Sequence, residues 1–253
     1  MGDSLTVGYN VGEANSWPNQ LQALLGDQYD VQTFAQNGLG AGKNSRGYAE
    51  PHDAAYIGYV DTFLQDALDS NASVVLLALG VMDAMEVNWE KDSGLDFSDS
   101  YADLVVQFKS LPSAPEVYLI IPNAEGTYMF GSGYESENPA LPDKIRGVAR
   151  NTQLGSEHVI DMREHFNKKC NWNAPVACDG GEGEDGEGSK PNPCRNLGSM
   201  NCGLWDLATK HPTPTGNLEW ARKVMDTILP KLRSEKDAER SNPSDWRDIP
   251  DQP

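Results

Sequence analysis

Two short, unbroken apolar runs constrain the fold more than any other feature of the chain. One spans residues 74–79 and ends at Gly80, and the other spans residues 117–121 and ends at Pro122. Continuous apolar runs of this length are typical of strands buried on both faces of a parallel sheet. Two shorter strands are expected at 31–35 and 159–161.

Amphipathic helical patterns separate these strands. Apolar residues recur at helical spacing over 14–26, 57–68, a segment capped by Ser98 that runs to Phe108, 139–154 and 218–232. Strands that alternate with helices predict βαβ units and a parallel sheet covered on both faces. The sequence therefore predicts one α/β domain over residues 1–233.

Two regions depart from this pattern. Residues 170–204 hold all four cysteines, and their centre at 180–188 is built of Gly, Glu and Asp. Such a composition cannot bury apolar surface, so a mobile insertion is expected there. Residues 234–253 are charged and proline-rich, which predicts a disordered tail.

The cysteines are clustered and even in number: Cys170, Cys178, Cys194 and Cys202. This pattern favours two local disulfides, although their connectivity stays open among three pairings. Disulfides in turn indicate an extracellular or secretory-pathway location. Zinc is the rival interpretation, but the spacings are wide and the sequence has no CxxC pair. No signal peptide is expected ahead of the domain.

Charge and hydropathy exclude two kinds of partner. The net charge is −18 and the pI about 4.5, so the chain repels phosphate backbones and no nucleic acid is expected to bind. No apolar run approaches the roughly 18–20 residues that a membrane-spanning helix needs.

The strongest sign of chemistry is the segment Gly2-Asp3-Ser4-Leu5-Thr6. A serine between a tight turn and a helix can expose its hydroxyl, and its own N–H can face a developing oxyanion. A histidine is the usual base for such a hydroxyl, and His211 lies just before the last helical segment. The remaining histidines, His52, His158 and His165, are expected at the surface.

Four motif blocks, in a fixed order, resemble the SGNH hydrolase superfamily, also called GDSL esterases. The segment 2–5 is similar to the nucleophile block and 37–42 to the glycine block. The segment 80–83 resembles the third block, usually Gly-x-Asn-Asp, and 206–212 the closing Asp-x-x-His-Pro block. The resemblance covers about residues 2–166 and 205–232.

This resemblance implies a three-layer α/β/α sandwich, flavodoxin-like, that hydrolyses carboxylic esters without a metal or organic cofactor. Ser4 would be the nucleophile, His211 the base and Asp206 the acid that orients the imidazole. The oxyanion and substrate positions would be Gly40, Gly42, Met82 and Asp83, with the N–H groups of Ser4 and Gly42 as donors. The implied substrates are small acyl esters, such as acetylated carbohydrate.

Three departures from the family pattern bear on activity. Met82 replaces the family asparagine, so one oxyanion donor is missing unless Asn37 or Asn44 supplies it. Ala208 stands where the family aspartate lies, and Asp206 is two residues upstream. The family's first strand is missing ahead of Gly2, and a truncated sequence would account for this and for the absent signal peptide.

Two functions therefore stay open. One is an active secreted esterase, in which an asparagine at position 82 would raise kcat. The other is a weakened or inactive SGNH domain that binds an acylated carbohydrate without turnover.

Overall fold

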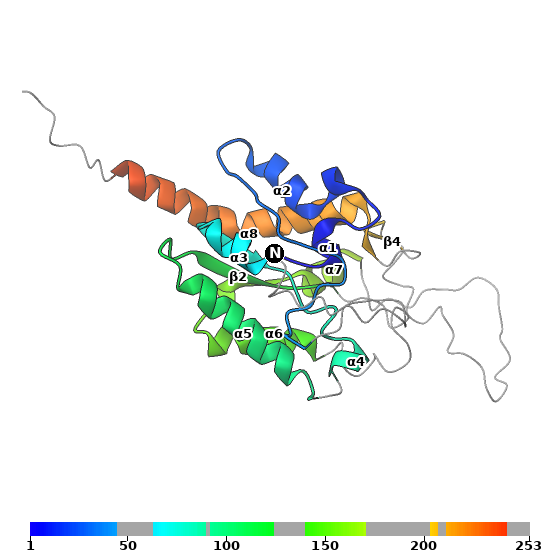
Figure 1. The fold of residues 1–253 in the computed structure, drawn as a ribbon. Helices are drawn as coiled ribbons and strands as arrows, with labels where there is room; N and C mark the ends of the chain where they lie inside the picture. The colour runs from blue at the N-terminus through cyan, green and yellow to red at the C-terminus, as the bar shows by residue number, and fades with distance from the viewer. Residues whose placement is uncertain (45–62, 90–91, 124–139, 171–202, 207–210, 242–253) are drawn as a thin grey trace, which may run out of the picture.

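The structure is a computed structural model that describes residues 1–44, 63–89, 92–123, 140–170, 203–206 and 211–241 (Figure 1). Its centre is a parallel sheet of β1 (Val74–Leu77), β2 (Glu116–Ile121) and β3 (Val159–Asp161), in the order β1-β2-β3. Leu77 lies opposite Leu119, and Ile121 lies opposite Asp161. The parallel sheet expected from the apolar runs is confirmed.

Met1 and Gly2 extend this sheet beyond β1. Gly2 forms parallel bridges with Ala78 on one side and Ala35 on the other. The strand order therefore reads Ala35, Gly2, β1, β2, β3, and Ala35 is the only bridged residue of the expected strand at 31–35. After Gly2 the chain first forms the neighbour on one side, at Ala35, and later forms β1, β2 and β3 on the other side. The strand order therefore reverses at Gly2. Ligands of open α/β sheets bind at such a reversal of strand order, beyond the carboxyl ends of the strands.

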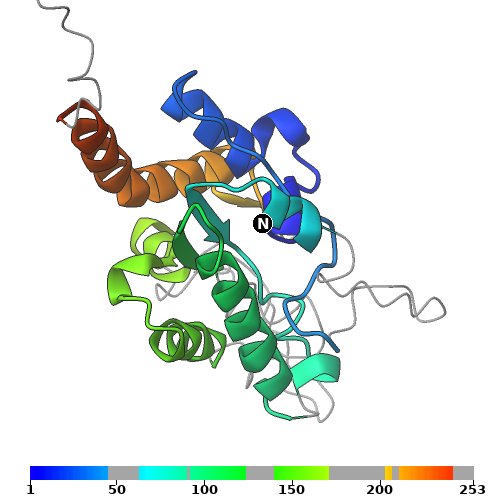
Figure 2. The same cartoon turned by 60° about the vertical axis from the view of Figure 1, so that its left-hand side comes forward.

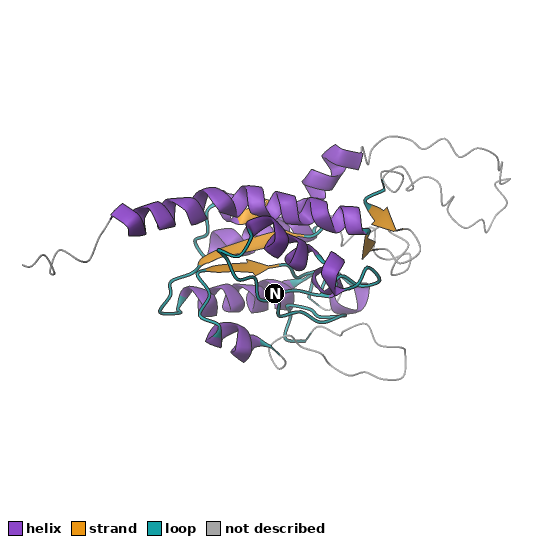
Figure 3. Ribbon diagram, turned by 90° about the horizontal axis from the view of Figure 1, so that it is seen from above, coloured by secondary structure: helices purple, strands orange, loops and turns teal. Residues whose placement is uncertain are grey.

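Helices cover both faces of the sheet (Figures 2 and 3). One core cluster joins the sheet to α3 (Leu64–Asp69), α5 (Leu95–Lys109) and α6 (Leu141–Asn151). The other joins it to α2 (Trp17–Leu25), α7 (Met162–Cys170) and α8 (Pro214–Ser241). Along β2, Leu119 and Ile121 belong to the first cluster, whereas Tyr118 and Ile120 belong to the second. This alternation produces the three-layer α/β/α sandwich.

Short elements complete the described chain. Three of them carry the residues expected to be catalytic: α1 (Ser4–Val7), and β4 (Trp205–Asp206) and β5 (His211–Pro212), which pair in antiparallel. The others are η1 (Glu13–Asn15), α4 (Glu86–Trp89) and η3 (Ser156–His158). No helix within the described ranges is long and apolar enough to cross a membrane.

One expected helix boundary is wrong. Helix α5 begins at Leu95, so Ser98 lies inside the helix and its hydroxyl donates to the Gly94 carbonyl at 2.9 Å. The cap comes instead from Asp92, whose carboxylate accepts from the N–H groups of Leu95 at 3.0 Å and Asp96 at 2.9 Å. Aspartate competes well with serine for this task because it also opposes the positive end of the helix.

The expected disordered tail begins as helix. Helix α8 continues through Ser241, because Lys, Glu and Arg are good helix formers and charge alone does not end a helix. The rest of that segment, 242–253, lies outside the described residues. So do residues 171–202 of the insertion, which include three of the four cysteines.

Asp3 is a buried carboxyl group at the start of α1. Its Oδ1 accepts from the Leu5 N–H at 2.9 Å and caps the helix. Its Oδ2 has no hydrogen-bond partner in the part of the chain that the structure describes, and the residue is 1% exposed. Burial raises the pKa of Asp3 to about 7, and the nearby charge of Asp83 acts in the same direction. The proton is therefore retained in the native state over a pH range in which the unfolded chain loses it.

We expect Asp3→Asn to change how stability depends on pH. In the unfolded chain the Asp3 carboxyl ionises near the ordinary aspartate pKa of 3.8, but in the native state it ionises near 7. The unfolded state binds fewer protons between these values, so this group lowers the free energy of unfolding as pH rises through that window. Asparagine keeps the oxygen that caps Leu5 and cannot titrate.

Urea unfolding of both proteins from pH 4 to 8 measures the effect. The variant should gain stability relative to wild type as pH rises toward 7, with no further gain above it. The Met1 ammonium is common to both proteins and cancels in the difference. Identical pH dependence in the two proteins would contradict the assignment.

Candidate active site

The turn that carries Ser4 depends on a very close approach of other atoms to Gly2. A Cβ atom at this position would lie 2.0 Å from Thr6 Oγ1 and 2.9 Å from the Ala78 carbonyl oxygen. Only glycine fits there, between strand β1 and the first turn of α1. Helix α1 ends at Gly8, which has a φ of 77° and caps the Ser4 carbonyl with its N–H. Ser4 is thus the first residue of a single helical turn at the carboxyl edge of the sheet.

Ser4 and His211 meet across this edge. The Ser4 Oγ lies 2.9 Å from His211 Nε2, although 207 residues separate the two along the chain. His211 is 7% exposed, and Ser4 is partly exposed. A serine hydroxyl within hydrogen-bond distance of a buried imidazole is the arrangement that nucleophilic catalysis requires. The structure therefore brings together the two residues that the sequence singled out.

Asn217 anchors the histidine segment, and the sequence analysis did not identify it. Its Oδ1 accepts from the Trp17 N–H at 3.2 Å, and its Nδ2 donates to the Pro212 carbonyl at 3.2 Å. One buried amide thereby ties the start of α2, strand β5 and the first turn of α8 to each other. His211 precedes Pro212 directly, so these bonds help to fix the position of the imidazole.

Asp206 lies on the strand that pairs with His211. The two residues are directly opposite in the β4–β5 register, which places Cα atoms about 4.5–5.5 Å apart in an antiparallel pair. The Asp206 side chain and the whole of Ala208 lie outside the described residues.

Asp83 holds the glycine block by two short hydrogen bonds. Its Oδ2 accepts from the Ala41 N–H at 2.8 Å, and its Oδ1 accepts from the Gly42 N–H at 2.7 Å. Asp83 is 1% exposed, and Gly40 is buried directly before this pair. The sequence analysis assigned the Gly42 N–H to an oxyanion, but here that donor is engaged by Asp83. The carboxylate at position 83 therefore holds the backbone of the glycine block in place.

Met82 packs into the apolar core. It is 5% exposed and belongs to the cluster that includes Ile120 and Trp220, while its carbonyl accepts from Asn88 Nδ2 at 2.7 Å. The two alternative donors are also placed elsewhere: Asn44 Nδ2 donates to Asp96 at 2.9 Å, and Asn37 is exposed. Neither asparagine replaces the missing amide in this arrangement.

Asn123 is a buried amide that the sequence analysis missed. It is 2% exposed, and neither Nδ2 nor Oδ1 has a hydrogen-bond partner among the described residues. Buried side-chain amides are nearly always hydrogen-bonded, so an unpaired one calls for an explanation. The sequence could have pointed to Asn123 by its position directly after Pro122. There strand β2 ends at the same edge of the sheet where Ser4 lies.

Tyr9 is a third residue that the sequence did not reveal. Its ring centroid lies 4.9 Å from that of His211, and the residue is 43% exposed. The ring therefore borders the imidazole and still faces solvent.

The other described histidines are held away from this pair. His158 Nδ1 lies 3.0 Å from the Val117 carbonyl oxygen, and His165 Nε2 lies 3.4 Å from Glu219. His52 lies outside the described residues. Within the described ranges, no group of three or more His, Cys, Asp and Glu residues is placed to hold a metal ion.

Comparisons with known proteins agree with this geometry. The model of the GDSL-like lipase/acylhydrolase family matches residues 1–218. No curated protein sequence matches the chain significantly.

Solved structures with the same fold include three esterases. A carbohydrate acetylesterase from Sinorhizobium meliloti has a TM-score of 0.58 at 18% identity, covering 91% of this chain and 96% of its own. The acetyl xylan esterase AlAXEase has a TM-score of 0.57 at 19% identity, and the match covers 90% of this chain and 96% of the esterase. An aryl esterase from M. smegmatis has a TM-score of 0.57 at 14% identity, and the match covers 91% of this chain and 96% of the esterase.

The family match spans both the nucleophile turn and the histidine segment, and the fold matches span nearly the whole chain. The chain belongs to the GDSL-like lipase/acylhydrolase family of hydrolytic esterases.

Proposed function

We propose that this protein is a serine esterase that removes small acyl groups through an acyl-enzyme. The observation that carries the proposal is the 2.9 Å contact between Ser4 Oγ and His211 Nε2 at the carboxyl edge of the sheet. Acetyl groups on carbohydrate are the proposed substrates, because two of the matched structures are acetylesterases that act on carbohydrate or xylan.

The reaction follows serine-hydrolase chemistry. Ser4 Oγ attacks the ester carbonyl carbon while His211 Nε2 takes its proton. The imidazolium then gives this proton to the leaving alcohol, and the acyl group stays on Ser4. Water, deprotonated by the same imidazole, attacks the acyl-enzyme and releases the acid. The Asp206 carboxylate is proposed to orient His211, which its backbone pairing with the histidine supports.

We propose that Asn123 supplies the side-chain donor that Met82 lacks. Gly2 and Ala78 are paired, and the β1–β2 register places Ala78 beside Ile120. Two residues further along each strand lie Ser4 and Pro122, and Asn123 follows. The unpaired Nδ2 of Asn123 is thus available to a substrate oxygen near Ser4, together with the Ser4 N–H. The Gly42 N–H would join them only if Asp83 released it.

A second candidate function rests on the Gly42 N–H, which is bonded to Asp83. Asp83 accepts the Gly42 N–H at 2.7 Å, which would leave the oxyanion hole short of one donor. A domain with this defect could bind an acylated carbohydrate and turn it over slowly or not at all. Calorimetric binding of acetylated xylo-oligosaccharide without release of acetate would favour this second function, whereas steady release of acetate would favour the esterase.

Ser4→Ala and His211→Ala should each lower the kcat for an aryl acetate by roughly 10⁴-fold or more, because nucleophile and base act as a unit. His158→Ala and His165→Ala are matched controls whose imidazoles contact other groups, and both should retain activity. Circular dichroism reports whether each variant is folded. Full turnover by folded Ser4→Ala, or equal damage from His165→Ala, would refute the assignment.

Asn123→Ala should lower kcat by about 10²–10³-fold with little change in KM, as expected for a donor that acts in the transition state. Its Tm should stay the same or rise, because the substitution removes a buried, unpaired amide. Met82→Asn should not raise kcat and should lower Tm, since an unpaired amide in an apolar cluster costs about 1–3 kcal/mol.

Asn44→Ala is the control for these variants, because its amide is bonded to Asp96 and its kcat should be unchanged. A higher kcat for Met82→Asn, combined with normal activity of Asn123→Ala, would place the donor at position 82 instead.

We further propose that the four cysteines form two disulfides and that the protein works in an oxidising compartment. The support is their even number and their clustering within residues 170–202. Titration of protein from an oxidising host, denatured but not reduced, should detect no free thiol. Four free thiols would contradict both parts of this proposal.

A further inference from the structure

An exposed aromatic ring stands beside the Ser4–His211 pair. Four large hydrophobic side chains are exposed among the described residues, and Tyr9, at 43%, is the aromatic one of the four. Its ring centroid lies 4.9 Å from that of His211, at an interplanar angle of 47°. Exposed aromatic rings beside reactive groups are typical of ligand sites, because a ring supplies much contact area and loses little conformational entropy on binding.

The loop that carries Tyr9 is held in place at both of its ends. At the start, the Tyr9 N–H donates to the Ser4 carbonyl at 3.1 Å. At the far end, Gln20 Nε2 donates to the Asn15 carbonyl at 2.7 Å and to the Pro214 carbonyl at 3.0 Å. Pro214 begins α8 shortly after strand β5. These bonds tie the loop to the turn of the serine and to the segment of the histidine, so the Tyr9 ring has a defined place next to both.

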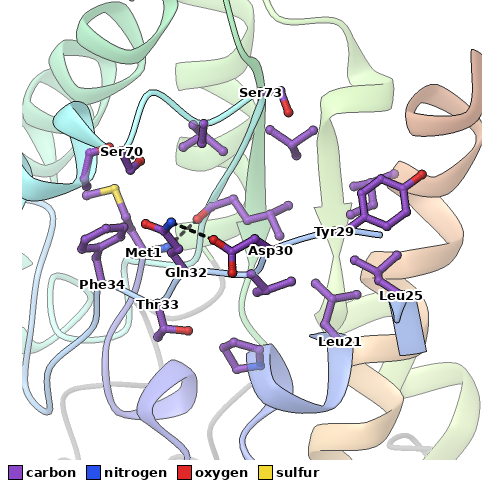
Figure 4. A pocket seen from close by; sticks show the side chains of 18 of the residues that line it. Met1, Leu21, Leu25, Tyr29, Asp30, Gln32, Thr33, Phe34, Ser70 and Ser73 are labelled. Carbon is purple, nitrogen blue, oxygen red and sulfur yellow. Dashed lines mark hydrogen bonds between the residues drawn. The ribbon is translucent and has the colours of Figure 1, made fainter. Parts of the chain in front are cut away.

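A cavity of about 500 Å³, between strand β1 and the segment 30–34, is separate from this rim (Figure 4). Thr6 is among the residues that line the cavity. The described residues Ser4, Tyr9 and His211 do not line it. An ester whose carbonyl carbon meets the Ser4 hydroxyl is therefore contacted by the rim at Tyr9 rather than by the walls of this cavity.

Proton transfer decides which half of the ester meets the Tyr9 ring. The acyl carbon bonds to Ser4 Oγ, and the bond from that carbon to the alcohol oxygen breaks. The leaving oxygen receives its proton from His211 Nε2, so it must come within hydrogen-bond reach of that nitrogen. The alcohol is thus the half of the ester that lies against the imidazole, and the Tyr9 ring borders the same imidazole.

We propose that Tyr9 is a specificity-determining residue whose ring packs against the alcohol half of the ester, with a pyranose ring as its favoured partner. A pyranose presents C–H groups of partial positive charge, which suit the negative face of an aromatic ring. The phenol hydroxyl can donate to and accept from sugar hydroxyls. This inference rests on the proposed esterase function, and it gives Tyr9 no part in breaking or making bonds and no contact with the acyl group.

The test compares two acetate esters that differ only in the alcohol. Tyr9→Ala should lower kcat/KM for acetylated xylotriose by about tenfold or more, as expected for the loss of one packed aromatic contact. For methyl acetate, whose alcohol is too small to cover the ring, kcat/KM should stay within about twofold of wild type. Tyr9→Phe keeps the aromatic face and should retain most of the activity on xylotriose. Leu24→Ala, which removes another exposed apolar side chain on α2, is the control and should leave both substrates unchanged.

Two kinetic results would overturn the proposal. Equal losses of kcat/KM on methyl acetate and acetylated xylotriose would show that the Tyr9 ring only positions His211. A changed ratio of kcat/KM between the acetate and the butyrate of one phenol would place the ring against the acyl half instead.

A binding measurement separates this inference from the proposed function, because it needs no turnover. Calorimetry gives the Kd of acetylated xylotriose for Ser4→Ala and for the double variant that also carries Tyr9→Ala. The second substitution should raise Kd by about tenfold. An unchanged Kd would overturn the inference whatever the turnover of the wild type. A Kd that depends on Tyr9, in a wild-type protein that releases no acetate, would instead refute the esterase and support the contact at Tyr9.

Discussion

The backbone hydrogen bonds on both edges of Met1 and Gly2 support everything else in this site. They place two residues between β1 and the segment 34–36, at the point where the strand order reverses. Gly2 has no room for a side chain, so the chain turns at once into α1 and presents Ser4 at the edge of the sheet. The position of Ser4 is therefore decided by strand pairing, and only then by the local turn.

Two buried carboxyl groups flank this turn and act on different segments. Asp3 caps the helical turn that carries Ser4, while Asp83 binds the two N–H groups of the glycine block. Their mutual repulsion is one cause of the high pKa of Asp3. A protonated Asp3 therefore leaves less negative charge beside Ser4 than an ionised one would.

The fold was largely predictable because its strands are buried on both faces. The runs at 74–79 and 117–121 appear as β1 and β2, and the strand at 159–161 appears as β3. The pairing of Ser4 with His211 was also predicted, but from the resemblance to known hydrolases, since nothing in the spacing brings residues 207 apart together.

Other features depend on tertiary contacts that a sequence does not contain. The cap of α5 at Asp92 and the pairing of Gly2 with both neighbours follow from how distant segments pack. The engagement of the Gly42 N–H and the unpaired amide of Asn123 could be seen only once the loops at the sheet edge were placed.

The anchoring of His211 has a consequence for how the protein fails under stress. Ser4 begins α1 two residues after Gly2, which pairs with the sheet, whereas His211 is attached through Asn217 to the first turn of α8 and the start of α2. Helix ends open more readily than buried strands. Low denaturant should therefore separate His211 from Ser4 while the sheet persists, so the contact between them should be lost before the secondary structure.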